Sequence, residues 1–301
     1  MTLRGPPADR TPAQRLSFGV VNLDKPPGPS SHQVSGWIRD AVADALETAG
    51  AEVSIDRAAH AGTLDPKVTG CLPVMLGDAT RLAPVFLEGR KEYVAVLECH
   101  GPVPSDVESV VAEFEGPIYQ KPPRKSAVSR RLRVREIYEL DVLETTDRQV
   151  LLRMRCESGT YVRKLCHDLG LALGTGAHMG HLRRTATDPF DDRTLRTAHD
   201  LLDALAFWAD EDDPDLLCEV VDPAERTLEH IPSVTIAESA AREVAHGAQV
   251  YAPGVIAADD VDRGTLVACY TPDGAAVCLG RLVGDPDAEE GVVVELERVL
   301  V

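Results

Sequence analysis

"HAGTLDPKVTGCLPVML", residues 60–76, sets the pair Asp65–Pro66 between two glycines and then continues into an apolar run. Asp followed by Pro suits a type I turn, in which the carboxylate bonds its own backbone. Glycines also let a ligand approach the backbone closely, and reactive carboxylates are found on exposed loops that rigid neighbours support. Two interpretations of Asp65 are therefore open at this point, a turn former and a catalytic carboxylate.

The length and composition indicate a globular protein of about two domains. The chain has 301 residues, 44% of them hydrophobic, which is enough for sizeable cores. No window approaches the ~20 consecutive apolar residues of a membrane span. Residues 1–16 are rich in Pro and Arg and lack an apolar signal core, so we expect a flexible N-terminal arm and a cytoplasmic protein. The seven cysteines are odd in number and show no CxxC spacing, which predicts reduced thiols and no zinc site.

The charge balance is strongly acidic, with a net charge of −18 at pH 7 and only six lysines among 31 basic residues. Self-repulsion of this size is tolerated best where salt screens it. We therefore predict the surface of a halophile, the alternative being an ordinary acidic cytosolic protein. Taken alone, the acidity argues against a nucleic-acid partner.

One segment reverses that impression. Residues 121–135, "KPPRKSAVSRRLRVR", carry seven bases and no acid. A dense basic segment in a net-acidic chain indicates contact with a polyanion, which predicts RNA or DNA binding. The alternative is an exposed loop that pairs with the protein's own acids. The basic residues are Lys121, Arg124, Lys125, Arg130, Arg131, Arg133 and Arg135.

Hydrophobic periodicity predicts an α+β body up to about residue 231 and a small, mostly β unit over 232–301. Apolar residues at helical spacing follow a Ser cap at residues 30–31, and further helices are expected over 105–114, 159–174, 198–230 and 237–246. Strand composition marks 91–99 and 149–156, and three more strands are expected in the last 40 residues. The glycines of 170–180 lack a preceding strand, so a dinucleotide-binding loop is not predicted.

A second candidate for chemistry is "ESGTYVRKLCHDLG", residues 157–170. An arginine on this helix that lay near an interior carboxylate would lower the carboxylate's pKa and orient it through a bidentate pair. The alternative is a helix whose bases are simply solvated. His178 and His181 are three residues apart, but no carboxylate or Cys completes a metal shell, so no metal is expected.

Five segments in order carry a resemblance: "VVNLDKPPGPSSHQV", "HAGTLDPKVTGCLPVMLGDATRL", "KEYVAVLECHG", "GTYVRKLCHDLGLALGTGAHMGHLRRT" and the terminal β unit. The chain resembles a TruB-type RNA pseudouridine synthase of the archaeal, dyskerin-like branch. The resemblance implies a pseudouridine synthase fold, with a central mixed or antiparallel sheet flanked by helices, over residues 17–231. It also implies a β-rich, RNA-binding PUA domain over 232–301.

The resemblance also implies the roles of individual residues. Asp65 matches the catalytic aspartate, acting as nucleophile at the anomeric carbon or in glycal formation. Tyr93 matches the tyrosine that stacks on the target base, and Arg163 the arginine that pairs with the aspartate. Substrate contacts are expected from Leu182, His60 and Tyr161. Support of the catalytic loop is expected from Lys25, Pro26, Gly62 and Thr63.

The implied reaction converts uridine in rRNA or tRNA to pseudouridine without a cofactor. The implied partners are the target RNA, an H/ACA guide RNA and the small subunits of the H/ACA ribonucleoprotein. A stand-alone synthase acting on the T-loop of tRNA is the alternative physiological role. A non-catalytic RNA-binding scaffold is the remaining alternative, which the joint presence of Asp65, Tyr93, Arg163 and Leu182 disfavours.

Overall fold

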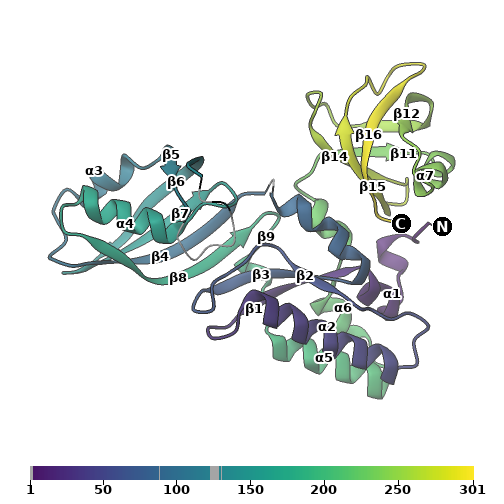
Figure 1. Cartoon of the computed structure of the whole chain (residues 1–301). Helices are drawn as coiled ribbons and strands as arrows, with labels where there is room; N and C mark the ends of the chain where they lie inside the picture. The colour runs from purple at the N-terminus through teal and green to yellow at the C-terminus, as the bar shows by residue number, and fades with distance from the viewer. Residues whose placement is uncertain (1–2, 88, 123–128, 130) are drawn as a thin grey trace.

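The computed structural model describes residues 3–87, 89–122, 129 and 131–301, and shows an elongated body with a smaller β-rich domain beside it (Figure 1). The strands of the body form one ten-stranded sheet, and those of the smaller domain form a separate six-stranded sheet. The mixed α and β architecture with a small β-rich unit confirms the predicted fold class. Among the described residues, no helix combines the length and the apolar character needed to cross a membrane.

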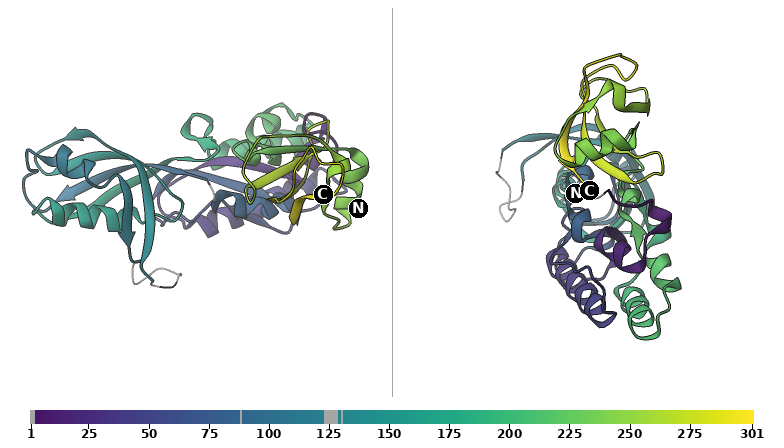
Figure 2. Two further views of the ribbon diagram at one scale, coloured as in Figure 1. Left: turned by 90° about the horizontal axis from the view of Figure 1, so that it is seen from above. Right: turned by 90° about the vertical axis from the view of Figure 1, so that its right-hand side faces the viewer.

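The sheet of the body has the order β10-β1-β3-β8-β4-β7-β6-β5, with β2 added beside β3 and β9 beside β8. Neighbouring strands are antiparallel except β3 and β8, which pair in parallel through only two residues of each strand. β8 therefore joins two half-sheets end to end, which explains the elongated shape in Figure 2. The strands are β1 (Gly19–Lys25), β2 (Ala58–His60), β3 (Thr69–Leu76), β4 (Lys91–Cys99), β5 (Gly116–Gln120), β6 (Arg133–Thr145), β7 (Gln149–Cys156), β8 (Ala177–Thr187), β9 (Phe190–Asp191) and β10 (Asp222–Pro223).

Helices cover each half-sheet and enclose a separate hydrophobic core. One core lies under α2, α5 and α6, and another lies under α3 and α4. Tyr93 and Leu182 contact both cores, so they mark the boundary between the two half-sheets. The helices of the body are α1 (Pro12–Ser17), α2 (Ser31–Thr48), α3 (Val107–Ala112), α4 (Val162–Ala172), α5 (Ala198–Glu211) and α6 (Asp215–Val220), and the 3-10 helices are η1 (Pro7–Asp9), η2 (Gly77–Leu87), η3 (Asp192–Thr194) and η4 (Ala224–Leu228).

Local sequence explains where these helices begin and end. The side chain of Ser30 accepts from the backbone of Gln33, whose side chain bonds back to Ser30, so a capping box starts α2. The helical segment expected over 198–230 is shorter than predicted. Asp212 adopts a left-handed conformation that ends α5, and α6 gives way at Val221 to β10 and a 3-10 turn.

The small domain contains the three strands predicted near the end of the chain, together with shorter ones. Its sheet order is β12-β16-β15-β14-β11-β13, and α7 packs against it. The apolar residues of these elements share one core. The elements are β11 (Ser233–Ile236), α7 (Glu238–Ala245), β12 (Val250–Tyr251), the 3-10 helix η5 (Ala252–Gly254), β13 (Val255–Ala258), β14 (Leu266–Tyr270), β15 (Ala276–Leu282) and β16 (Val292–Val299).

The N-terminal segment lies against both domains, which differs from the loose arm expected for residues 1–16. Arg10 is buried and donates two hydrogen bonds, of 2.8 and 2.6 Å, to the carboxylate of Glu225. The same carboxylate accepts from the backbone N–H of Ala276 in β15, 3.1 Å away. Arg10, one of the arginines that made the segment look solvated, therefore meets a buried acceptor at the domain junction.

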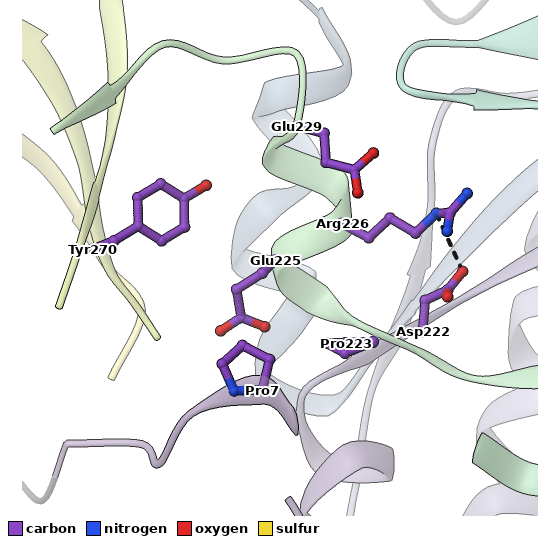
Figure 3. A pocket seen from close by; sticks show the side chains of 7 residues that line it. All are labelled: Pro7, Asp222, Pro223, Glu225, Arg226, Glu229 and Tyr270. Atoms are coloured by element: carbon purple, nitrogen blue, oxygen red, sulfur yellow. Dashed lines mark ion pairs between the residues drawn. The ribbon is translucent and has the colours of Figure 1, made fainter. Parts of the chain in front are cut away.

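A pocket of about 390 Å³ opens beside this junction. Figure 3 shows Tyr270 approaching it from the small domain, while Pro7 comes from the N-terminal segment. Its other lining residues come from the segment that leads to the small domain: Asp222, Pro223, Glu225, Arg226 and Glu229.

Candidate active site

Asp65 lies on the loop between β2 and β3, where a hydrogen bond of 2.9 Å from the N–H of Val68 to the carbonyl of Asp65 closes a turn. Its carboxylate is about half exposed, with 53% of the side-chain surface open to solvent. The side chain of Arg163, also about half exposed, forms an ion pair with it through Nη2. The structure thus brings together the two candidates that lie 98 residues apart in the chain.

Lys25 holds the backbone of this loop from the protein interior. Its side chain is fully buried, and Nζ donates to the carbonyls of Pro26 (2.9 Å), Pro66 (3.1 Å) and Val68 (2.9 Å). Burial lowers the pKa of Lys25 from its usual value. The lysine therefore fixes the part of the turn that follows Asp65 without pairing with the carboxylate.

Ser31 and Arg184 hold the loop at two further points. The hydroxyl of Ser31 accepts from the N–H of Leu64 at 2.8 Å and donates to the carbonyl of Leu64 at 3.1 Å. Arg184, almost fully buried, donates to the carbonyl of Gly62 at 3.2 Å and to that of Cys71 at 2.7 Å. Gly62 has a φ of +96°, a conformation that favours glycine. Thr63 is exposed on the same loop.

Tyr93 lies beside Arg184 at the boundary between the two cores. The two residues are paired across β4 and β8. Burial raises the pKa of Tyr93, and the positive charge of Arg184 opposes that rise. Leu182 pairs with Ala95 in the same ladder, so Leu182 and Tyr93 are diagonal neighbours on one face of the sheet.

His60 and Tyr161 lie at the edges of this group. Burial lowers the pKa of His60, and the charges of Arg184 and His32 lower it further, so the imidazole is neutral at pH 7. Its Nδ1 is buried and has no hydrogen-bond partner in the part of the chain that the structure describes. Tyr161 directly precedes α4, two residues before Arg163, and its backbone pairs with the side chain of Gln120.

The predicted basic segment lies at the β5–β6 connection. Arg124, Lys125 and Arg130 lie outside the described residues. Lys121 and Arg131 are exposed, and Arg133 begins β6 partly exposed. Arg135 instead forms an ion pair of 2.7 Å with Glu157. For this residue the structure matches the alternative interpretation, in which the basic segment pairs with the protein's own acids.

Three residues of the site, Ser31, Gln120 and Arg184, were not singled out from the sequence as parts of it. The sequence presents Ser31 as a possible helix cap, and it places Arg184 two residues after Leu182 in "HLRRT". A polar or charged residue within an otherwise buried strand or helix face is the signal that could have found them, because such groups require internal partners.

Models of known protein families match most of the chain. The profile of the TruB family pseudouridylate synthase N-terminal domain matches residues 51–106 and 99–162. The tRNA pseudouridylate synthase B C-terminal domain matches 163–229, the PUA domain matches 232–300, and the DKCLD domain matches 5–35.

Whole-chain relatives extend the match. The chain is 64% identical over 312 residues, covering all of both proteins, to "Probable tRNA pseudouridine synthase B" of Halobacterium salinarum. It is 63% identical over 308 residues to the protein of that name from Haloarcula marismortui, covering all of this chain and 94% of that protein.

Solved structures match over nearly the same length. "Crystal Structure of a Cbf5-Nop10-Gar1 Complex" contains a chain 43% identical, with a TM-score of 0.89 over 99% of this chain and 90% of that one. "Structure of H/ACA RNP bound to a substrate RNA containing 2'-deoxyuridine" contains one 41% identical, with a TM-score of 0.88 and the same two coverages. With these matches covering its catalytic body and its small domain, the chain belongs to the TruB family of pseudouridine synthases, enzymes that isomerise uridine in RNA.

Proposed function

We propose that Asp65, Tyr93 and Arg163 carry out the isomerisation. The observation that carries this proposal is the ion pair between Arg163 and the half-exposed carboxylate of Asp65. A neighbouring guanidinium favours the ionised carboxylate and orients it. An ionised and exposed carboxylate can act at the anomeric carbon of an extruded uridine, as nucleophile or by promoting a glycal.

The target base then lies against Tyr93 and Leu182. Stacking on an aromatic ring and contact with an apolar wall offset the few kcal/mol needed to extrude a base from folded RNA. His60, neutral and with an unpartnered Nδ1 among the described residues, contacts the flipped nucleotide. Tyr161 lines the same site. Lys25, Pro26, Gly62 and Thr63 support or complete the catalytic loop.

Asp65→Asn tests the proposed chemistry. The amide keeps the size of the side chain and its position on the loop but cannot act as a nucleophile, so product formation should fall below detection. Affinity for RNA and the melting temperature should stay close to wild type, because the replaced carboxylate is half exposed. Appreciable pseudouridine formation by the folded variant would contradict the role given to Asp65.

We propose further that the chain works in an H/ACA ribonucleoprotein, with a guide RNA and small protein subunits, on rRNA or tRNA. The support is its similarity over 99% of its length to chains whose titles name Nop10, Gar1 and an H/ACA particle bound to substrate RNA. In this proposal residues 17–231 are the catalytic domain and 232–301 the PUA domain, which binds RNA. The curated relatives named for tRNA favour the second candidate, a stand-alone tRNA synthase.

Incubation of the purified protein with a tRNA transcript, and with a target RNA in the presence and absence of guide RNA and subunits, separates these roles. Guide-dependent turnover of the target is the expected result. Full turnover of tRNA by the protein alone, with no effect of the guide, would instead identify a stand-alone enzyme.

We propose that the protein is archaeal and halophilic and that it works in the cytoplasm, where its RNA substrates are made. The support is the net charge of −18 and the two haloarchaeal relatives above 60% identity. Salt screens repulsion among surface carboxylates. The free energy of unfolding, measured by chemical denaturation with urea, should therefore rise between dilute buffer and molar KCl. An unchanged or falling value would contradict the halophilic assignment.

A further inference from the structure

Gln120, the last residue of β5, forms hydrogen bonds to a single residue through both the nitrogen and the oxygen of its side-chain amide. Its side chain is buried, with 1% of the residue exposed. Nε2 donates to the carbonyl of Tyr161 at 3.1 Å, and Oε1 accepts from the N–H of Tyr161 at 2.8 Å. A buried amide must be hydrogen-bonded, but pairing both ends with a single backbone residue also fixes that residue in position and direction.

Tyr161 is where α4 begins. Its carbonyl also accepts from the N–H groups of Lys164 and Leu165, each at 3.0 Å, so it closes the first turn of the helix. Arg163 lies inside that turn. Within the described ranges its only hydrogen bond is the one to Asp65, and its side chain is 54% exposed. The direction of the guanidinium therefore depends on how the start of the helix is held.

The neighbouring strand, β6, holds the residues just before this turn at a second point. Arg135 of β6 donates to Oε1 of Glu157 at 2.7 Å, and Oε2 of Glu157 accepts from the N–H of Glu136 at 3.1 Å. The Arg135 guanidinium also lies against Gly159, where a Cβ would be 3.4 Å from Nη2. Both strands of the β5–β6 hairpin thus grip the connection from β7 to α4.

We propose that Gln120 is a positioning residue for Arg163: by holding Tyr161 it fixes the start of α4, and with it the direction of the guanidinium that pairs with Asp65. The inference rests on the catalytic role proposed above for Arg163.

The test compares Gln120→Met, which keeps the length of the side chain and removes both hydrogen bonds, with Gln120→Glu, which keeps only the acceptor for Tyr161 N–H. Gln149→Met is the matched control, because Gln149 is exposed at the start of β7. Misplacing a reacting group by about 1 Å lowers rates on the order of 100-fold. Single-turnover rates should therefore fall about 10- to 100-fold in Gln120→Met, less in Gln120→Glu, and not in the control. The Kd for RNA should change less than about twofold, since Gln120 is buried.

A purely structural role is separated by repeating Gln120→Met in an Arg163→Ala background, with Arg163→Lys as a second background of higher residual rate. If Gln120 acts through Arg163, its loss should slow the Arg163→Ala enzyme less than about twofold. Hydrogen exchange should rise in peptides spanning 157–166 and stay unchanged in 232–301.

Three outcomes would overturn the inference. One is a wild-type rate in both folded Gln120 variants, and another is an equal loss with and without Arg163. The third is an Arg163→Ala enzyme as fast as wild type, which would remove the proposed role of Arg163 as well. In the first two outcomes the proposed role of Arg163 survives. Failure of the inference about Gln120 can therefore be distinguished from failure of the proposed function.

Discussion

Lys25, Lys91 and Arg184 are almost fully buried, and all three donate to backbone carbonyls: Lys25 and Arg184 to carbonyls of the catalytic loop, and Lys91 to those of Phe86 and Gly89 before β4. Within the part of the chain that the structure describes, none of them forms an ion pair with a carboxylate. Burying a cation is costly unless it is hydrogen-bonded, and charge-assisted bonds to carbonyls are the stronger kind. Lys25 and Arg184 thus fix the path of the catalytic loop, and Asp65 remains half exposed with Arg163 as its partner.

The buried Lys91 should make the free energy of unfolding depend on pH. Burial, and then the charge of Arg184, lower its pKa to about 8 from 10.5. Between pH 8 and 10.5 the unfolded chain holds a proton that the folded protein has lost, so this group makes unfolding less favourable as pH rises. Its contribution should total about 3 kcal/mol, at 1.36 kcal/mol per unit.

The measurement is the free energy of unfolding of wild type and Lys91→Met, followed from pH 7.5 to 10.5. The difference between the two curves removes the titration of the cysteines and tyrosines that they share. Wild type should gain stability relative to the variant over this range. Parallel curves would show that Lys91 is not perturbed in the folded protein.

Among single residues, the sequence predicted those that stand within a recognisable motif. Asp65 stands in a recognisable loop and Arg163 in a recognisable helix, and the structure pairs them. Gln120, Ser31 and Arg184 act by reaching backbone atoms of Tyr161, Leu64 and Gly62. Which backbone atom lies within reach depends on strand pairing and loop path, which residue spacing alone does not contain.

The β5–β6 hairpin is an element with two different faces. Gln120 and Arg135 turn toward the β7–α4 connection, whereas Tyr119 and Val134, paired across the ladder, are 70% and 49% exposed. Period-two alternation places successive side chains on opposite faces. One hairpin can therefore grip the catalytic body and still offer basic and apolar groups to RNA.

Reversal of Lys121 and Arg131, both exposed, to Glu tests the outward contribution. Removing one base that binds a phosphate should reduce the slope of log K against log salt by about one, so binding should weaken for all RNA sequences and become less salt-dependent. Arg148→Glu, at the β6–β7 turn, is the control. A loss of folding with unchanged affinity per folded molecule would make the segment structural.

Elements with long periodic patterns were predicted well, and short ones were not. Strand composition over eight or nine residues predicted β4 and β7, whose bounds match those expected. The two-residue strands β9, β10 and β12 exist only because a partner strand offers a free edge. The same applies to the end of the segment 198–230, where β10 forms by pairing with β1.

At the scale of the whole molecule, Glu225 connects three parts of the chain: the N-terminal segment through Arg10, the segment leading to the small domain, and β15 through Ala276. The side chains of Arg10 and Glu225 are only 4% and 10% exposed. Removal of one partner from a buried pair leaves an uncompensated charge. The relative placement of the two domains therefore depends on a contact that the composition of residues 1–16 did not reveal.

Arg10→Gln should lower the free energy of unfolding by about 3 kcal/mol, within the range for broken buried pairs, and should raise hydrogen exchange in β15. Arg39→Gln serves as the control, because its pair with Asp40 is exposed and such pairs contribute about 1 kcal/mol or less. Equal effects of the two substitutions would show that the Arg10–Glu225 pair does not stabilise the junction.

The two ends of the described chain lie side by side, and far from the β5–β6 hairpin (Figures 1 and 2). Arg4 donates to the carbonyl of Leu300 at 3.3 Å, and Leu3 packs against the core of the small domain. A donor and an acceptor fluorophore placed at residues 5 and 298, which are exposed, would therefore transfer energy efficiently while leaving the hairpin unobstructed. The efficiency of energy transfer would fall if the N-terminal segment is released as KCl is diluted. This measurement reports on the segment separately from any change at the catalytic loop.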